Sequence, residues 1–227
     1  WHASQLRTDG TITDYTGTYP AFSSTGDYDS SDSYPAMYLM TLWRYWQVTE
    51  DRAFIESLQS AIAQSVAAME LTLQSDWLTW AKPTYHMKYT MDNSEVFQGF
   101  FAAAQLARLL EDDVQYQDWL YKANQVRNAV LDQLYYGDTL GRYAIAKSNA
   151  GTLVGGWDNY YPDAMAGLMA IVYTHAPQSA RTLTVWQNTI DRFSPQYVPD
   201  PSSGWLDCAV ALLAGDSLRF SLNHVIH

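Results

Sequence analysis

The chain has 227 residues, and its 24 Asp and Glu against 13 Lys and Arg give a formal net charge of −11 at pH 7. This acidic balance, without any cluster of Lys or Arg, excludes a nucleic-acid-binding protein, because DNA or RNA would be repelled. The one cysteine, Cys208, excludes an intrachain disulfide, and no Cys/His cluster predicts a metal site. The longest apolar run, around 208–214, is too short for membrane insertion. We therefore expect one globular domain over 1–227 with no metal and no cofactor.

The composition also carries information on location and ligand. Aromatic residues make up 15% of the chain and charged residues only 16%. Gln, Ser, Thr, Asn and Tyr stand where a cytosolic helical protein usually has Glu and Lys, which favours an extracytoplasmic, secreted or periplasmic protein. The flat faces of Trp and Tyr suit stacking on sugar rings, although most large aromatic residues of a helical protein pack its core.

In chain order, an irregular segment comes first and paired helices follow. Residues 1–31 are rich in Gly, Ser, Thr and Asp and show no sustained periodicity, which predicts irregular structure. Apolar stripes with steps of three and four then predict helix pairs separated by short turns. The expected pairs are 35–48 with a helix capped by Thr49 and ending near 73, 93–111 with 114–135, 162–173 with 179–193, and, partly visible, 204–214 with 217–226.

The spacing of the pairs predicts the architecture. Longer connections at 75–92, 136–159 and 194–203 separate the pairs, and 137–144 is predicted to form a small β-hairpin. Short turns that alternate with long loops are typical of helical hairpins stacked in a ring or solenoid, whose long loops all lie at one end. No tetratricopeptide consensus is present, which favours a barrel-like array. We therefore predict an all-α fold, a helical-hairpin α/α toroid whose helices cover well over half of the chain.

Three acidic motifs lie where long loops enter helices. They contain Asp32, the pair Asp92 and Glu95, and Asp163. Each alone is better explained by helix capping, since Pro35 and Pro162 suit a first helical turn and Asp92 with Glu95 has capping-box spacing. Capping does not explain the Trp, Tyr and Lys residues around the motifs. Carboxyl groups among aromatic residues at one end of a helical barrel indicate a glycosidase, which needs a carboxylic acid and a second carboxylate.

Four strings resemble the bacterial six-hairpin glycosidase-like superfamily, which has an (α/α)6 toroid fold. They are Asp-Ser-Ser-Asp-Ser-Tyr (29–34), Leu-Thr-Trp-Ala-Lys-Pro-Thr-Tyr (78–85), Lys-Tyr-Thr-Met-Asp-Asn-Ser-Glu-Val (88–96) and Tyr-Pro-Asp-Ala (161–164). The resemblance covers about 26–195 and implies a sugar-binding cleft at the long-loop end. It also implies acid and base roles for residues among Asp32, Asp92, Glu95 and Asp163. About four predicted hairpins, against six in the full toroid, indicate a shortened or partial member.

We therefore expect a glycoside hydrolase that acts on an oligo- or polysaccharide. Glu95 is the expected general acid and Asp32 the expected general base, with Asp92 and Asp163 in reserve. Burial and repulsion from Asp92 should raise the pKa of Glu95 more than a helix N-terminus lowers it. The expected substrate-binding residues are Tyr34, Trp80, Lys82, Tyr85, Lys88, Trp157, Tyr160 and Tyr161. The two lysines would bind hydroxyls or an acidic substituent such as a uronate.

Two alternatives stay open. The superfamily also contains polysaccharide lyases and sugar epimerases, so a uronate lyase or sugar epimerase with His86 or a tyrosine as base is the alternative within enzymes. From another class, the chain is a carbohydrate-binding or scaffold domain of a larger secreted protein, which needs only the aromatic platform. In each case the expected partner is a carbohydrate, and no protein partner is predicted.

Overall fold

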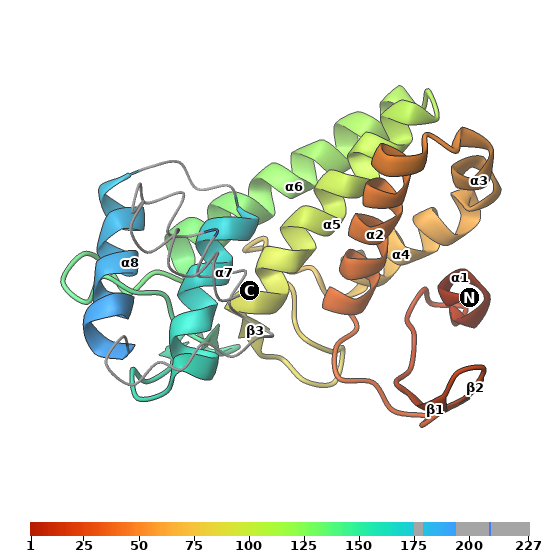
Figure 1. Ribbon diagram of the computed structural model, residues 1–227. Coiled ribbons are helices and arrows are strands. Elements are labelled where there is room, and N and C mark those ends of the chain that lie inside the picture. The colour runs from red at the N-terminus through yellow and green to blue at the C-terminus, as the bar shows by residue number, and fades with distance from the viewer. Residues whose placement is uncertain (175–178, 194–208, 210–227) are drawn as a thin grey trace.

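The computed structural model describes residues 1–174, 179–193 and 209, and this part of the chain is mostly helical. Helices α2, α5 and α7 lie side by side, with α5 in contact with both of the others (Figure 1). Each is followed by a partner helix, α4 packs against α2, and α6 packs against α5. The predicted all-α, toroid-like arrangement of helical hairpins is confirmed. In the described residues, no helix is long and apolar enough to cross a membrane.

The first hairpin consists of α2 (Ser33–Thr49), α3 (Arg52–Ser57) and α4 (Gln59–Thr72). The expected cap by Thr49 is wrong, because its hydroxyl donates to the Tyr45 carbonyl inside α2. Asp51 caps the next helix instead and accepts a hydrogen bond from the Phe54 N–H at 3.0 Å. The expected single second helix is also interrupted, since α3 ends before Leu58 and α4 begins after it.

The second hairpin consists of α5 (Thr90–Leu109) and α6 (Asp113–Gln133), with Asp112 as the N-cap of α6. Helix α5 begins three residues earlier than expected. The Thr90 N–H and hydroxyl donate to the carbonyls of Ile145 and Ala144, at 2.8 and 2.6 Å. These bonds satisfy the first turn of α5 from a distant loop, so the predicted capping box is wrong. Asp92 lies inside the first turn of the helix, and the N-cap is Tyr89.

The third hairpin consists of α7 (Met165–Tyr173) and α8 (Ala180–Phe193). A π-helix, η1 (Tyr160–Ala164), precedes α7, so α7 starts three residues after the expected Pro162. The expected turn at 176–177 and the fourth pair, at 204–214 and 217–226, lie outside the described residues, apart from residue 209.

Strands are short and belong to loops. The strands β3 (Lys88–Tyr89), β4 (Ala146–Lys147) and β5 (Leu153–Val154) form an antiparallel sheet in the order β3-β4-β5. The predicted hairpin at 137–144 contains no strand, and only an isolated bridge joins Tyr135 to Tyr143. The N-terminal segment is less irregular than expected, because it contains α1 (His2–Gln5) and a hairpin of β1 (Tyr15–Thr18) and β2 (Ala21–Ser24).

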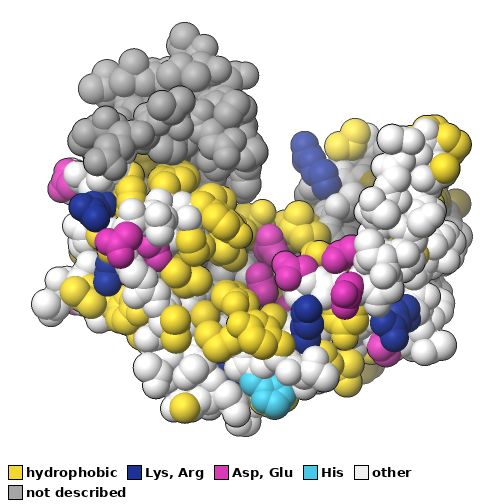
Figure 2. Space-filling model, turned by 90° about the horizontal axis from the view of Figure 1, so that it is seen from below, with side chains coloured by type: hydrophobic (Ala, Val, Ile, Leu, Met, Phe, Trp, Pro, Cys, Tyr) yellow, Lys and Arg dark blue, Asp and Glu magenta, His cyan; other side chains and the backbone are white. Residues whose placement is uncertain are grey.

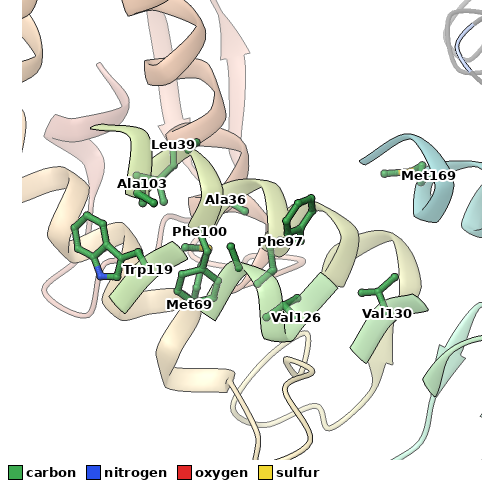
Figure 3. Packing of buried hydrophobic residues seen from close by; sticks show 14 of the residues in the cluster. Ala36, Leu39, Met69, Phe97, Phe100, Ala103, Trp119, Val126, Val130 and Met169 are labelled. Carbon is green, nitrogen blue, oxygen red and sulfur yellow. The ribbon is translucent and has the colours of Figure 1, made fainter. Parts of the chain in front are cut away.

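The hydrophobic core lies between the helices of the first two hairpins and continues into the third, where it includes Leu168 of α7 and Trp186 of α8. Figure 3 shows Phe97 and Phe100 of α5 among side chains of α2, α4 and α6. Helices α2 and α5 approach each other closely at Gly99, where an added Cβ would lie 2.6 Å from the Cα and Cβ of Ala36. Ala36 lies in the first turn of α2, and Ser33 before it forms a hydrogen bond with Glu95, so the start of α2 lies beside the first half of α5. Both segments carry acidic residues.

Candidate active site

A cavity of about 490 Å³ opens at the end of the molecule where the long loops lie. Figure 2 views this end and shows acidic side chains gathered in a hollow. The wall comes from the loop before α2, the loop around 81–85, the start of α5, the loop before β4 and the π-helix. Its residues are Asp29, Ala81, Lys82, Tyr85, Tyr89, Met91, Asp92, Ile145, Tyr161 and Pro162. All three acidic motifs of the sequence therefore contribute a residue to one cavity.

Asp32 lies behind this wall and has no exposed surface. Its Oδ1 accepts hydrogen bonds from the Ser30 hydroxyl at 2.5 Å and the Ser33 N–H at 2.9 Å, and its Oδ2 accepts one from the Thr79 hydroxyl at 2.5 Å. Burial raises the pKa of Asp32, and these hydrogen bonds oppose the increase. Both oxygens have partners within the protein, so Asp32 is placed to act on its neighbours through charge.

Asn93 orients the groups around Asp32. Its Oδ1 accepts from the Thr79 N–H at 2.7 Å, and its Nδ2 donates to the carbonyls of Tyr89 and Thr79 at 2.9 and 3.2 Å. The amide therefore joins the first turn of α5 to the loop that carries Thr79, and Thr79 is held against Asp32. The sequence analysis did not identify these partners, although Ser30, Thr79 and Asn93 all lie inside the strings that carried the family resemblance.

Glu95 and Asp92 share one face of the first turns of α5, and both are half-buried. Burial first, and then the charge of Asp32, raise the pKa of Glu95 to about 7, against hydrogen bonding from Ser33. Burial, followed by the charges of Asp32, Glu95 and Asp29, raises the pKa of Asp92 well above its usual range. The direction for Glu95 is the one expected from the sequence. The group of Asp32, Asp92 and Glu95 therefore keeps at least one proton at neutral pH.

Asp163 has a different environment from the other three carboxyl groups. Its carboxylate accepts hydrogen bonds from the backbone N–H groups of Gly156, Asp158 and Asn159, at 3.2, 2.9 and 3.0 Å. It is buried, and the cavity wall at this point is made by the preceding Tyr161 and Pro162. These hydrogen bonds hold the loop at 156–159 against the π-helix, and they support Tyr161 and Pro162 in the cavity wall.

Of the expected substrate-binding residues, Lys82, Tyr85 and Tyr161 line the cavity. Tyr85 and Tyr161 have exposed fractions of 48% and 66%, which leaves their rings available for stacking. The Tyr85 hydroxyl lies 3.1 Å from that of Tyr89, a wall residue that the sequence analysis did not select. Asp29 was likewise not selected, although it is the first residue of the string at 29–34.

The other expected substrate-binding residues contact protein groups elsewhere. Trp80 stacks on His86 with ring centroids 3.9 Å apart, and the Lys88 ammonium binds the Asp76 carboxylate at 2.6 and 2.7 Å. Trp157 and Tyr160 both contact the ring of Phe193.

The hydroxyl of Tyr34 donates to Asp14, and its ring lines a second cavity of about 660 Å³ between α2 and the N-terminal segment. That second cavity also contains Tyr38, Tyr45 and Phe54, and its wall is largely apolar. Among the described residues, no group of three or more His, Cys, Asp or Glu side chains is arranged to hold a metal ion.

Comparison with known proteins gives a similarity to solved structures. No protein-family model and no curated protein matches the chain. Among solved structures, the chain is similar to a rhamnosidase from Klebsiella oxytoca with rhamnose bound, with a TM-score of 0.67 and 14% sequence identity. The similarity covers 96% of this chain and 41% of the rhamnosidase chain. At this identity it shows a glycosidase-like helical fold, and the chain spans less than half the length of that protein.

Proposed function

We propose that the chain is a glycoside hydrolase domain that acts on an oligo- or polysaccharide by carboxylate acid–base catalysis. The observation that carries the proposal is Glu95, a carboxyl group whose pKa of about 7 leaves about half of it protonated in neutral solution. A second carboxyl group, Asp92, lines the adjacent cavity, together with the exposed rings of Tyr85 and Tyr161. The rhamnosidase similarity supports the same class of fold.

The proposed reaction uses these groups in two roles. The Glu95 carboxyl gives its proton to the glycosidic oxygen as the bond from that oxygen to the anomeric carbon breaks, which releases one sugar as an alcohol. Water adds to the anomeric carbon, and its proton passes to an ionised carboxylate, so the products are a hemiacetal and an alcohol. We assign the second role to Asp92, because Asp92 lines the cavity whereas Asp32 has no exposed surface. The charge of Glu95 contributes to the raised pKa of Asp92, so a protonated Glu95 favours the ionised state of Asp92.

In this proposal Asp32 is a positioning residue rather than the base. Its charge raises the pKa of both Asp92 and Glu95, and its three hydrogen bonds hold it in place behind them. A like charge close to a carboxyl group favours retention of a proton, which is the state that a general acid requires. Asp163, with three backbone partners, supports the wall of the cavity in this scheme.

The alternative of a uronate lyase or epimerase has less support. Its base would have to lose a proton readily, but burial and the nearby Tyr85 raise the pKa of Tyr89 far above its ordinary value. The ring of His86 is stacked on Trp80, and its Nε2 lies 2.9 Å from the Pro83 carbonyl. We also propose that the chain belongs to the six-hairpin superfamily, because its helices form hairpins in a glycosidase-like fold. We propose an extracytoplasmic location because of the composition.

The test is hydrolysis of a panel of 4-nitrophenyl glycosides, with the α-L-rhamnoside included, and of neutral oligosaccharides followed by reducing-end release. Glu95→Gln should lower kcat/KM for the oligosaccharides about 10²–10⁴-fold, because the amide has no acidic proton to give to the sugar that leaves. The 4-nitrophenyl glycosides should be affected less, because 4-nitrophenolate leaves without protonation. Glu50→Gln is the matched control, since Glu50 is exposed at the far end of α2 and should leave the rate unchanged. The wild-type rate should fall as the pH rises through about 7, where Glu95 loses its proton.

Two further variants separate the roles. Asp92→Asn should lower the rate to a similar extent as Glu95→Gln. Asp32→Asn should move the alkaline limb of the pH–rate profile to lower pH, because it removes the charge that raises the pKa of Glu95. Near-normal turnover in Glu95→Gln would contradict the assignment of Glu95 as the general acid. Sugar binding without hydrolysis of any substrate would support the carbohydrate-binding alternative instead.

A further inference from the structure

Asp29 is an exposed carboxylate on the cavity wall that the proposed reaction does not use. It lies in the loop before α2, opposite the start of α5. Its charge raises the pKa of Asp92 on α5, of Tyr89 at the N-cap of α5 and of Tyr34 on α2. The negative potential of Asp29 therefore reaches groups on the other elements at the cavity, and it adds to the negative potential of Asp32 and Glu95 at Asp92.

Positive charge around the cavity is limited and already in contact with protein groups. Among the described residues that line the cavity, Lys82 is the one Lys or Arg, and its Nζ lies over the Tyr28 ring, 5.4 Å from the centroid. The guanidinium of Arg7 lies over the same ring at 6.0 Å. Lys88, the second lysine expected to meet an acidic substituent, instead shares the Asp76 carboxylate with Lys147. In the described part of the cavity wall, Asp29 and Asp92 thus outnumber the single basic residue, Lys82.

We propose that Asp29 is a specificity-determining residue that excludes uronates, so that the sugar bound in this cavity carries no carboxylate. This inference rests on the proposed function, since it assumes that the cavity binds a sugar. A uronate would place a further negative charge beside Asp29 and Asp92. Two like charges about 6 Å apart, at an effective dielectric constant of about 40, repel strongly enough to change a Kd about tenfold.

The experiment measures binding without hydrolysis. Isothermal titration calorimetry compares tetramers of galacturonan, mannuronan and glucuronan, each as the free acid and as the neutral methyl ester. The members of a pair share stereochemistry and differ in charge. The wild-type protein should bind at least one ester about tenfold more tightly than its acid. The ratio should shrink in Asp29→Asn and reverse in Asp29→Lys.

Two controls separate charge at the cavity from other effects. Asp27→Asn removes an exposed carboxylate two residues away, outside the cavity wall, and should leave the ratio of affinities unchanged. High salt should shrink the ratio in the wild-type protein, because the Debye length falls from about 10 Å at 0.1 M to about 3 Å at 1 M. A loss of packing caused by the substitution would weaken the acid and the ester alike.

Several results would overturn the inference: equal affinities for acid and ester in the wild-type protein, a ratio that Asp29→Asn leaves unchanged, or no binding of any tetramer. Failure here is distinguishable from failure of the proposed function. Hydrolysis of a neutral oligosaccharide that Glu95→Gln slows at least about 10²-fold would uphold the hydrolase even if uronates bind well. Charge-selective binding without any turnover would uphold the role of Asp29 and contradict the proposed hydrolase activity.

Discussion

The raised pKa of Glu95 makes a prediction about stability that needs no knowledge of the substrate. Glu95 keeps its proton in the folded protein up to a pH of about 7, whereas its ordinary pKa is 4.5. A carboxyl group whose pKa is raised by folding stabilises the folded state fully below the unfolded-state pKa. That stabilisation is lost as the pH rises to the folded-state value. Wild-type stability should therefore decrease between about pH 4.5 and about pH 7.

The size of the effect follows from the two pKa values. Each pKa unit corresponds to about 1.4 kcal/mol at 25 °C, so a rise from 4.5 to about 7 corresponds to about 3 kcal/mol of unfolding free energy. Glu95→Gln removes the titration and keeps the size of the side chain. It should gain up to about 3 kcal/mol relative to the wild-type protein between about pH 5 and about pH 8. The charge of Glu95 also raises the pKa of Asp92, so the substitution removes this repulsion as well. The loss of repulsion adds to the gain in unfolding free energy.

Urea unfolding followed by circular dichroism measures this difference at several pH values. Glu50→Gln provides the control for loss of one negative charge from an acidic protein, because its carboxylate is exposed at the opposite end of the helices. The pH dependence of Glu50→Gln should follow that of the wild-type protein. The comparison therefore isolates the burial of Glu95 and its repulsion by Asp32.

Two results would refute this reasoning. If the free-energy difference between Glu95→Gln and the wild-type protein stays constant with pH, Glu95 does not change its pKa on folding. If the variant loses stability relative to the wild-type protein as the pH rises, the hydrogen bonding from Ser33 outweighs burial and Glu95 is ionised. Either result would also remove the observation that carries the proposed general acid.

The remaining predictions concern the parts of the fold that hold the cavity in place. Asp76→Ala leaves the buried Lys88 and its neighbour Lys147 without their shared carboxylate and should cost about 3 kcal/mol in urea unfolding; a loss below about 0.5 kcal/mol would contradict a structural role for this ion pair. Gly99→Ala should lower Tm, since a Cβ 2.6 Å from Ala36 costs about 1–3 kcal/mol of overpacking, more than the helix propensity of Ala returns. A raised Tm would show that α2 and α5 can move apart.

The helical hairpins could be predicted from the sequence because their signals are local. The apolar stripes of α2, α5 and α6 recur every three or four residues, and the acidic turns at 49–51 and 111–113 separate them correctly. A short turn forces the next helix to pack back against the previous one, so the alternation of short and long connections was enough to predict long loops at one end. The location of the acidic motifs at that end follows from the same pattern.

The role of each acidic side chain was decided by tertiary contacts. The spacing of Asp92 to Glu95 predicts a helix cap at Asp92, but carbonyl groups more than fifty residues away move the start of α5 to Thr90. Asp32 was expected to reach the substrate, and a hydroxyl from the loop after α4 covers it instead. Lys88 was expected to meet a sugar and instead binds Asp76.

By itself, then, the sequence determined the helical pairing, the end of the molecule that carries the loops, and the set of acidic residues that meet there. It could not determine which carboxyl group is exposed, which is hydrogen-bonded and which keeps a proton. Helix periodicity is set by neighbours three and four residues away, whereas a pKa depends on burial and on charges that only the folded chain brings together. Glu95 and Asp163 are both acidic residues near the start of an inner helix. The folded chain surrounds the first with other carboxyl groups and the second with backbone N–H groups.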